Sequence, residues 1–358
     1  MTTVNASSPT DVAAADLATT GATNVRSESP ERLPSTPAAG RIMRVSRIVL
    51  DRYSGVVVLI LLIVVFSLLK PDTFFTVRTL RTLVSDQAVT AVASVGLLIA
   101  FACGAFDLSI GGVLGLGIVM VTWLQAVQHV PAWLAVIVTL GVGMSVGAAN
   151  GLIVTALKVN SFIATLAMAS IMEAVIYGVS GGRQIVGSIS PGFVRLGQAQ
   201  PSGIPAPIFY MVGVALIAWL VLEHTPVGRY IYAVGSNAEA ARLSGIRTNR
   251  YLFGSLVASA FLATFAGVLF AAKIGSGSLT AGPPYLLPAF AAVLLGTTQV
   301  KPGRANVGGT IVAIFLVATG SKGLQLLGVP IWVSSLFNGT VLIVAVSLSQ
   351  LRKSLRAT

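Results

Sequence analysis

Ten apolar stretches follow one another along this chain, and they limit its fold more than any other feature. Several approach the roughly 20 residues that a helix needs to cross a bilayer. Charged residues make up only 9% of the chain, against about 25% in soluble domains, because a charge inside a bilayer is costly. The approximate spans are 54–69, 87–105, 108–128, 132–157, 161–180, 207–223, 251–272, 286–300, 305–321 and 331–349.

Only α-helices and closed β-barrels satisfy every backbone hydrogen bond inside a bilayer. The strands of a membrane barrel alternate apolar and polar residues, whereas the apolar runs here are unbroken, as in 56–69. We therefore predict an all-α, polytopic helical bundle in a lipid bilayer, with about ten (8–10) transmembrane segments. A broken or re-entrant segment is expected either at the tight boundary 105–108 or in the short, proline-containing stretch 286–300.

The distribution of basic residues predicts the orientation of the bundle. With the amino terminus inside and ten crossings, 16 of the 23 Lys and Arg residues fall on the cytoplasmic side and seven on the other. Basic residues gather on the cytoplasmic side of membrane proteins, so we predict that both termini are cytoplasmic. The same rule accounts for the net charge of +12 without a nucleic-acid partner. The chain divides into a disordered cytoplasmic tail (1–45), a transmembrane domain (46–352) and a cytoplasmic end (353–358).

A polar loop, 223–250, lies on the predicted cytoplasmic side and contains the signals of one short helix. Asn237 is a good N-cap, Glu239 suits the first turn, and Gly245 suits a left-handed cap after the last turn. A helix of two turns is not stable alone, so it packs either against its own chain or against a partner protein. The predicted helix and its caps comprise Asn237, Ala238, Glu239, Ala240, Ala241, Arg242 and Gly245.

Few ionisable residues lie inside the apolar stretches, and those few are candidates for a solute pathway. Asp107 precedes the stretch that begins at Leu108. It either caps that helix, which is the commoner role, or belongs to a gate or pathway. Glu173 either pairs with a neighbouring helix, again the commoner role, or contacts solute. Phe106 and Phe162 are candidates for stacking on a solute, although such rings more often pack against helices or lipid.

The chain lacks the residue sets of common catalytic and metal sites. It has one cysteine and two histidines that lie far apart in the sequence, and no plausible Ser/His/Asp set or paired acid and base stands out. A G-x-x-x-x-G-K-[ST] phosphate loop does not occur in it. We therefore predict no catalytic residue, no metal site and no cofactor. Any ATP that drives this protein would be hydrolysed by another polypeptide.

Four segments in register resemble the ribose-type permeases of ABC transporters, which are membrane subunits of bacterial sugar importers. One is the loop 223–250 with its short helix. A second, 104–111, reads Gly-Ala-Phe-Asp-Leu-Ser-Ile-Gly and is similar to the signature G-x-D-L-S-V-G. A third joins 150–154 to 162–166, similar to G-x-x-I and F-I-A-T-L. The fourth, 323–329, is similar to N-G-L-N-L-L-G-V.

This resemblance covers about 50–350 and implies a function and a set of partners. It implies a permease subunit for a sugar or sugar-like solute in the bacterial cytoplasmic (inner) membrane. The implied partners are a second permease copy (a homodimer), an ATP-binding cassette ATPase subunit and an extracytoplasmic substrate-binding protein. ATP binding and hydrolysis would switch the pathway between outward- and inward-facing states. The helix at 237–244 would be the ATPase-coupling helix, and the signature at 104–111 adds Ser109 to the pathway candidates.

One segment departs from this family. Members often carry A-G-x-G-Y-E-L-D-A-I-A-A-V-V-L-G-G-T, whereas this chain has Leu286 and Pro288 at the two acidic positions. The identity of the solute therefore does not transfer with the resemblance. An ion-coupled secondary transporter is the alternative reading, but such carriers use buried carboxylates or broken-helix ion sites, and buried carboxylates are scarce here.

Overall fold

The computed structural model describes residues 54–330, 332–341, 343, 344 and 347. Within these residues the regular structure is helical, and its one β-bridge, Ile185 to Gly277, lies outside any strand. The predicted tail (1–45) and the cytoplasmic end (353–358) lie outside the described residues. The last apolar stretch is helical over 332–341.

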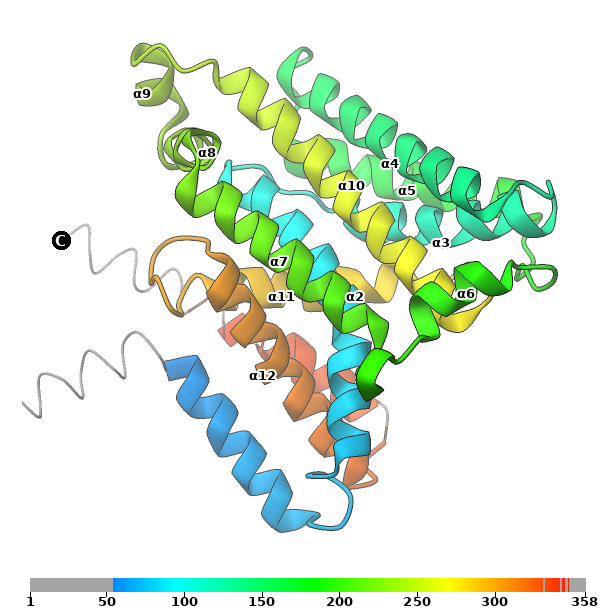
Figure 1. Ribbon diagram of the computed structural model, residues 1–358. Coiled ribbons are helices and arrows are strands. Elements are labelled where there is room, and N and C mark those ends of the chain that lie inside the picture. Colours follow the sequence, from blue (N-terminus) through cyan, green and yellow to red (C-terminus); the bar gives the residue numbers. More distant parts are fainter. Residues whose placement is uncertain (1–53, 331, 342, 345–346, 348–358) are drawn as a thin grey trace, which may run out of the picture. The chain divides into compact units, whose positions relative to one another are not determined.

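Six helices in the described part of the chain are long and apolar enough to cross a bilayer, by length and composition (Figure 1). Three shorter apolar helices accompany them: Ser54–Leu69, α3 (Ile110–Ala126) and Pro283–Gly296, where the 3-10 helix η2 (Pro283–Tyr285) leads into α11 (Leu286–Gly296). The all-α membrane fold is thus confirmed, whereas the count of about ten crossings stays a prediction. The six long helices are α2 (Val77–Ala102), α4 (Ala132–Thr155), α5 (Ser161–Ser180), α7 (Ala206–His224), α10 (Thr248–Ile274) and α12 (Val307–Leu326).

α2 begins well before the apolar stretch that predicted it. The expected start at residue 87 was wrong, because Arg78, Arg81 and Asp86 make the first turns of the helix polar. The side chain of Thr76 caps these turns by accepting a hydrogen bond from the N–H of Thr79 at 3.1 Å. Charged side chains are costly in contact with lipid, so these first turns of α2 must contact water or polar groups of the protein.

α10 lies at the centre of the packing, against α2, α3 and α4. Close approach of α3 and α10 depends on two glycines. Gly117 faces the backbone of Thr264, and Gly267 faces the carbonyl oxygen of Leu114, so a Cβ at either position would clash with backbone atoms. Small residues at helix contacts are typical of membrane bundles, because packing rather than the hydrophobic effect holds the helices together in lipid.

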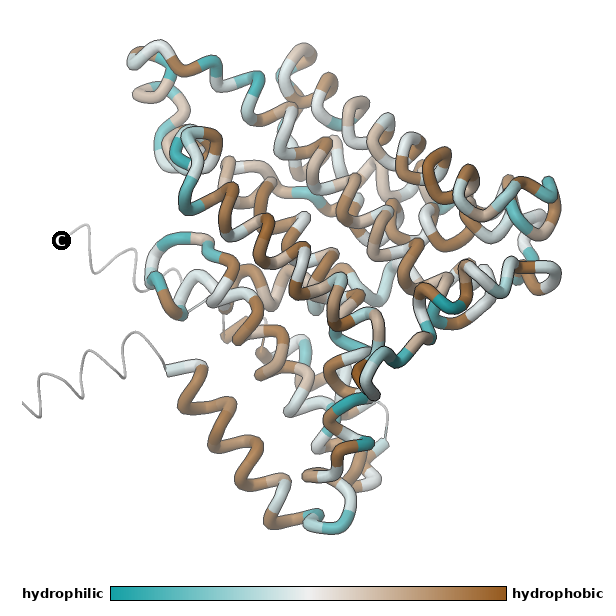
Figure 2. The backbone as a smooth tube through the Cα atoms, viewed as in Figure 1, coloured by the Kyte–Doolittle hydropathy of each residue, from teal (hydrophilic) through white to brown (hydrophobic). Residues whose placement is uncertain are grey.

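The helices differ in how much of them the protein covers. In the apolar windows of α2 and α10, 78% and 72% of the residues are buried, against 28% in α4, α5 and α7. Figure 2 shows apolar residues along these less covered helices. A soluble protein rarely exposes such surface, so these faces are the lipid-facing ones. Their exposed side chains include Trp133, Ile137, Ile163, Ile171, Ile217 and Leu220.

The polar connections lie at the two ends of α7. At its beginning, α6 (Pro191–Gln198) packs against α7 and α10. At its end, α7 leads into α8 (Pro226–Ser236), which is followed by α9 (Ala238–Leu243). A helix of 19 residues is about 28 Å long, close to the thickness of the hydrocarbon core. The α6 end and the α9 end of the bundle are therefore on opposite sides of a membrane (Figure 1).

Candidate functional site

α9 is the short capped helix that the sequence predicts. The side-chain oxygen of Asn237 accepts a hydrogen bond from the N–H of Ala240 at 2.9 Å. After the last turn, Gly245 has a φ of 82°, a left-handed conformation that costs other residues energy. The N–H of Gly245 donates to the carbonyl oxygen of Arg242 at 3.0 Å. Both predicted caps are confirmed, and the helix ends at Leu243.

One residue of α9 is buried against the rest of the protein, and the others are exposed. Ala241 is only 5% exposed and belongs to the hydrophobic core of the protein. The side chains of Ala238, Glu239, Ala240 and Arg242 are exposed. Ala241, one of the residues of the predicted coupling helix, is therefore not part of a surface open to a partner, because it anchors α9 to its own chain. The other faces of α9 remain free to bind another protein.

Glu239 and Arg242 form an ion pair on the exposed side of α9. The guanidinium donates two hydrogen bonds to the carboxylate, at 2.6 and 3.2 Å. These hydrogen bonds and the nearby positive charge hold the pKa of Glu239 below its usual value, so the pair is charged at neutral pH. An ion pair this exposed adds little to stability, since water screens it. Its consequence is a fixed arrangement of charge on the surface of α9.

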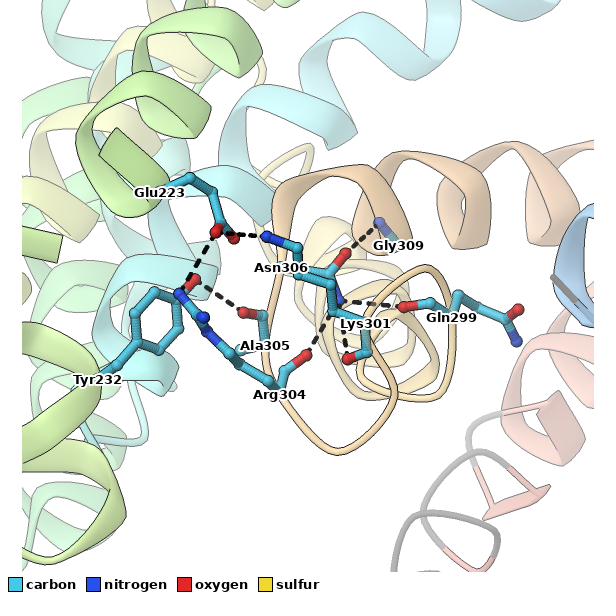
Figure 3. Close-up of polar contacts among 8 residues, drawn as sticks. All are labelled: Glu223, Tyr232, Gln299, Lys301, Arg304, Ala305, Asn306 and Gly309. Atoms are coloured by element: carbon cyan, nitrogen blue, oxygen red, sulfur yellow. Dashed lines mark hydrogen bonds and ion pairs between the residues drawn. The ribbon is translucent and has the colours of Figure 1, made fainter. Parts of the chain in front are cut away.

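A cluster of charged residues joins the end of α7 to the loop between α11 and α12 (Figure 3). The Glu223 carboxylate, whose side chain is 10% exposed, accepts from Lys301 Nζ at 2.5 Å and from Arg304 at 3.5 Å. The guanidinium of Arg304 also lies over the ring of Tyr232, 3.6 Å from its centroid. The hydroxyl of Tyr232, on α8, donates to the carbonyl oxygen of Ala305 at 2.8 Å. We call these five residues the Glu223 cluster.

Asn306 stabilises the loop between α11 and α12 by hydrogen bonds within the loop. Its side-chain oxygen accepts from the N–H of Gly309 at 2.7 Å and so caps α12. Its amide donates to the carbonyl oxygens of Gly296, Gln299 and Arg304 at 3.0–3.2 Å. The loop 297–306 is thus hydrogen-bonded to α11 and α12 on one side and, through the Glu223 cluster, to α7 and α8 on the other. A displacement of α8 would therefore be transmitted to α11 and α12.

Asp107 is completely buried, and all its hydrogen bonds go to its own chain. One carboxylate oxygen accepts from the N–H of Ser109 at 3.0 Å and from its hydroxyl at 2.5 Å. The other accepts from the hydroxyl of Ser259 on α10 at 2.7 Å. The predicted helix start at Leu108 was wrong: α3 begins at Ile110, with Ser109 as its N-cap. Asp107 therefore does not cap a helix in the predicted way, but ties the α2–α3 connection to α10.

Asp107→Ala is expected to destabilise the protein by at least about 2 kcal/mol, because three buried donors lose their acceptor at a cost of about 1–3 kcal/mol each. Asp107→Asn should cost less, since an amide oxygen still accepts and the Ser259 hydroxyl can turn to accept from the amide. Thermal unfolding of the purified protein in detergent measures the difference. If the Asp107→Asn variant unfolds like wild type but no longer transports solute, Asp107 belongs to the gate or pathway and its role is not only structural.

The other pathway candidates differ in their exposure. Ser109 is buried with Asp107, and its hydroxyl also accepts from Asn150 at 2.9 Å. Phe106 and Phe162 are 42% and 48% exposed. Glu173 is exposed beside a cavity of about 370 Å³ between α3, α5 and the 279–286 segment. Within the described residues Glu173 has no hydrogen bond or ion pair, so the expected pairing with a helix of this chain is not found.

The charged residues that the structure brings together are mostly ones that the sequence did not single out. Glu223 and Lys301 are 78 positions apart, and Asp86 pairs with Lys273 over 187 positions at 2.6 Å. The signal available in the sequence was weak: each is a single charge close to an end of an apolar stretch. Which charges of this kind meet is decided by how the helices pack.

Comparison of this chain with known proteins identifies its family. The family model described as "Branched-chain amino acid transport system / permease component" matches residues 79–346. The ribose import permease protein of Haemophilus influenzae is 32% identical over 306 residues, 85% of this chain and 94% of that protein. The ribose import permease protein of Escherichia coli K12 is 34% identical over 82% of this chain and 91% of its own length.

A more distant relative and the solved structures complete the comparison. The L-arabinose transport system permease protein of Escherichia coli K12 is 28% identical over 86% of this chain and 93% of its own length. The search of solved structures found no match. The chain therefore belongs to the family of branched-chain amino acid transport system permease components, and the predicted resemblance to ribose-type ABC transporter permeases is confirmed.

Proposed function

We propose that this protein is the permease subunit of an ABC importer that moves a sugar or sugar-like solute across the inner membrane. The family match supports the permease role, and the relatives named for ribose import and for L-arabinose transport support the solute class. The observation that carries the proposal is α9, a short helix anchored by Ala241 and otherwise free, at the polar end of the bundle. Such a helix suits insertion into a groove of another protein.

In this proposal the energy comes from a separate ATP-binding cassette subunit. α9 docks on that subunit, and the Glu223 cluster passes its movement to α11 and α12. A substrate-binding protein delivers the solute at the α6 end, and a second permease copy completes the pathway. The 16-to-7 distribution of basic residues supports cytoplasmic termini and a cytoplasmic α9.

Ser236→Cys, in a Cys103→Ala background, is expected to resist an impermeant thiol reagent applied to intact cells and to react after the cells are opened. Ser236 is exposed, whereas the native Cys103 is buried, so the new thiol is the one that reports. Labelling is measured by the mass shift of the purified protein. A cysteine at Arg183, in the connection at the α6 end, is the matched control and should react in intact cells. The reverse pattern would invert the orientation.

Uptake of labelled sugars by cells that carry the complete transport system tests the function itself. Loss of the permease should abolish uptake, and uptake should follow the cellular ATP level when the membrane potential is collapsed by an ionophore. Purification of the permease should bring the ATPase with it. Uptake that follows the ion gradient and needs no ATPase would instead identify an ion-coupled secondary transporter.

A further inference from the structure

A cavity of about 420 Å³, lined by both polar and apolar side chains, lies between α2, the η2–α11 segment and α12. Its volume is within the range of small-molecule sites, about 300–1,000 Å³. The lining includes eight residues with hydrogen-bonding side chains: Asp86, Gln87, Thr90, Tyr285, Ser321, Lys322, Gln325 and Asn338. Both donors and acceptors are present, which is what the hydroxyl groups of a sugar require.

The position of this cavity suits a solute that arrives from the α6 end. It shares Asp86 with a larger cavity of about 740 Å³, which is lined by the start of α2, by Gly197 and Gln198 at the end of α6, and by Gln200 just after it. Polar groups between membrane helices are costly unless they face water, a solute or one another. The two cavities share Asp86 and both have charged side chains in their lining, and we call them together the chamber.

The charges around this chamber do not balance. Asp86 is paired with Lys273 at 2.6 Å, so its charge is already compensated. Lys322 is half-buried in the lining of the smaller cavity and forms no ion pair within the part of the chain that the structure describes. Arg78 and Arg81 line the larger cavity. An ammonium group that is partly removed from water and unpaired favours an anion beside it.

Apolar side chains line the rest of the smaller cavity, among them Leu83, Pro288 and Val317. The rings of Phe270 and Tyr285 also line the cavity, edge to face at 5.9 Å, and offer apolar surface to the C–H groups of a sugar ring.

We propose that this cavity binds a hydroxylated anion of monosaccharide size, with Lys322 pairing with its acidic group and the polar residues of α2 and α12 with its hydroxyls. This deepens the proposed function, on which it rests for the solute class. The shared chemistry is one negative group on a polyhydroxylated ring, and it is met by a sugar acid or by a sugar phosphate. A neutral sugar leaves Lys322 without a partner.

Binding to the full-length permease in lipid nanodiscs tests the proposal without the ATPase. Calorimetry with D-galactose, D-galacturonate and D-galactose 6-phosphate, and with the corresponding D-glucose series, varies only the group at the sixth carbon within each series. We expect at least one of the anions to bind about tenfold more tightly than its neutral parent. The acid and the phosphate arms show which anion is preferred.

Lys322→Met, which keeps the apolar stem and removes the charge, should lose that tenfold preference and keep the weak binding of the neutral sugar. Lys70→Met, at an exposed position outside the cavity, is the control and should bind like wild type. Equal binding of anion and neutral sugar by wild type, no binding of either, or an unchanged preference in Lys322→Met would overturn the proposal. None of these outcomes bears on ATPase docking, which uptake and co-purification measure separately.

Discussion

Glu239→Arg is expected to abolish uptake and to separate the permease from its ATPase, while the amount of permease in the membrane stays normal. Glu239 is exposed on α9, away from the face that Ala241 anchors, so the substitution changes the free surface and leaves the bundle untouched. It places two cations three residues apart on a helix that a groove in another protein would enclose. Labelled sugar uptake, co-purification of the ATPase and immunoblotting of membranes measure the three effects.

A charge exchange within α9 separates docking from helix stability. Glu239→Arg with Arg242→Glu restores an ion pair between the same two positions, but it reverses the charge pattern that a partner meets. If docking depends on that pattern, the exchanged variant fails as the single variant does. Recovery of uptake in the exchanged variant would mean that only the internal pair matters. Normal uptake by the single variant would refute the coupling role of α9.

Glu223→Lys is expected to lower uptake at least tenfold and to uncouple it from ATP hydrolysis. It replaces the one carboxylate of the Glu223 cluster by a third cation next to Lys301 and Arg304. Losing one partner of a fully buried ion pair costs about 3–5 kcal/mol. The cost here is smaller, about 1–3 kcal/mol, because the Lys301 side chain is 41% exposed. The loop 297–306 would then lose its ion pairs with the end of α7.

The ratio of solute moved to ATP hydrolysed, in proteoliposomes with the complete transporter, measures this uncoupling. Glu223→Gln should give an intermediate value, since it keeps the shape and one acceptor. Glu223→Lys with Lys301→Glu restores an opposite pair and should recover part of the coupling. Tyr232→Phe removes only the hydrogen bond to Ala305 and serves as a mild comparison. If the double variant is no better than Glu223→Lys, the ion pair does not carry the coupling.

The parts of this protein that depend on neighbouring residues were predictable from the sequence. Apolar stretches long enough for a bilayer predicted a helical membrane bundle, because backbone groups in lipid must be satisfied within each segment. The caps of α9 were predictable for the same reason: Asn237 and Gly245 act on atoms within a few residues of themselves. The start of α2 was missed because Arg78 and Arg81 line a cavity and Asp86 pairs with Lys273, and neither arrangement follows from the neighbouring sequence.

The sequence by itself therefore determined the class of fold, the family and the short capped helix. These follow from the length of the apolar stretches, from four segments similar to known permeases and from hydrogen bonds between neighbouring residues. Only the tertiary structure decided that Ala241 is an anchor, that Asp107 reaches Ser259 across 152 positions, and that Glu223 meets Lys301 across 78. The same packing placed Lys322 in the lining of a cavity where, among the described residues, it forms no ion pair. A charge in an apolar segment is costly without a partner or water. Which partner it meets depends on how the helices pack, and helix packing joins residues that no local pattern relates.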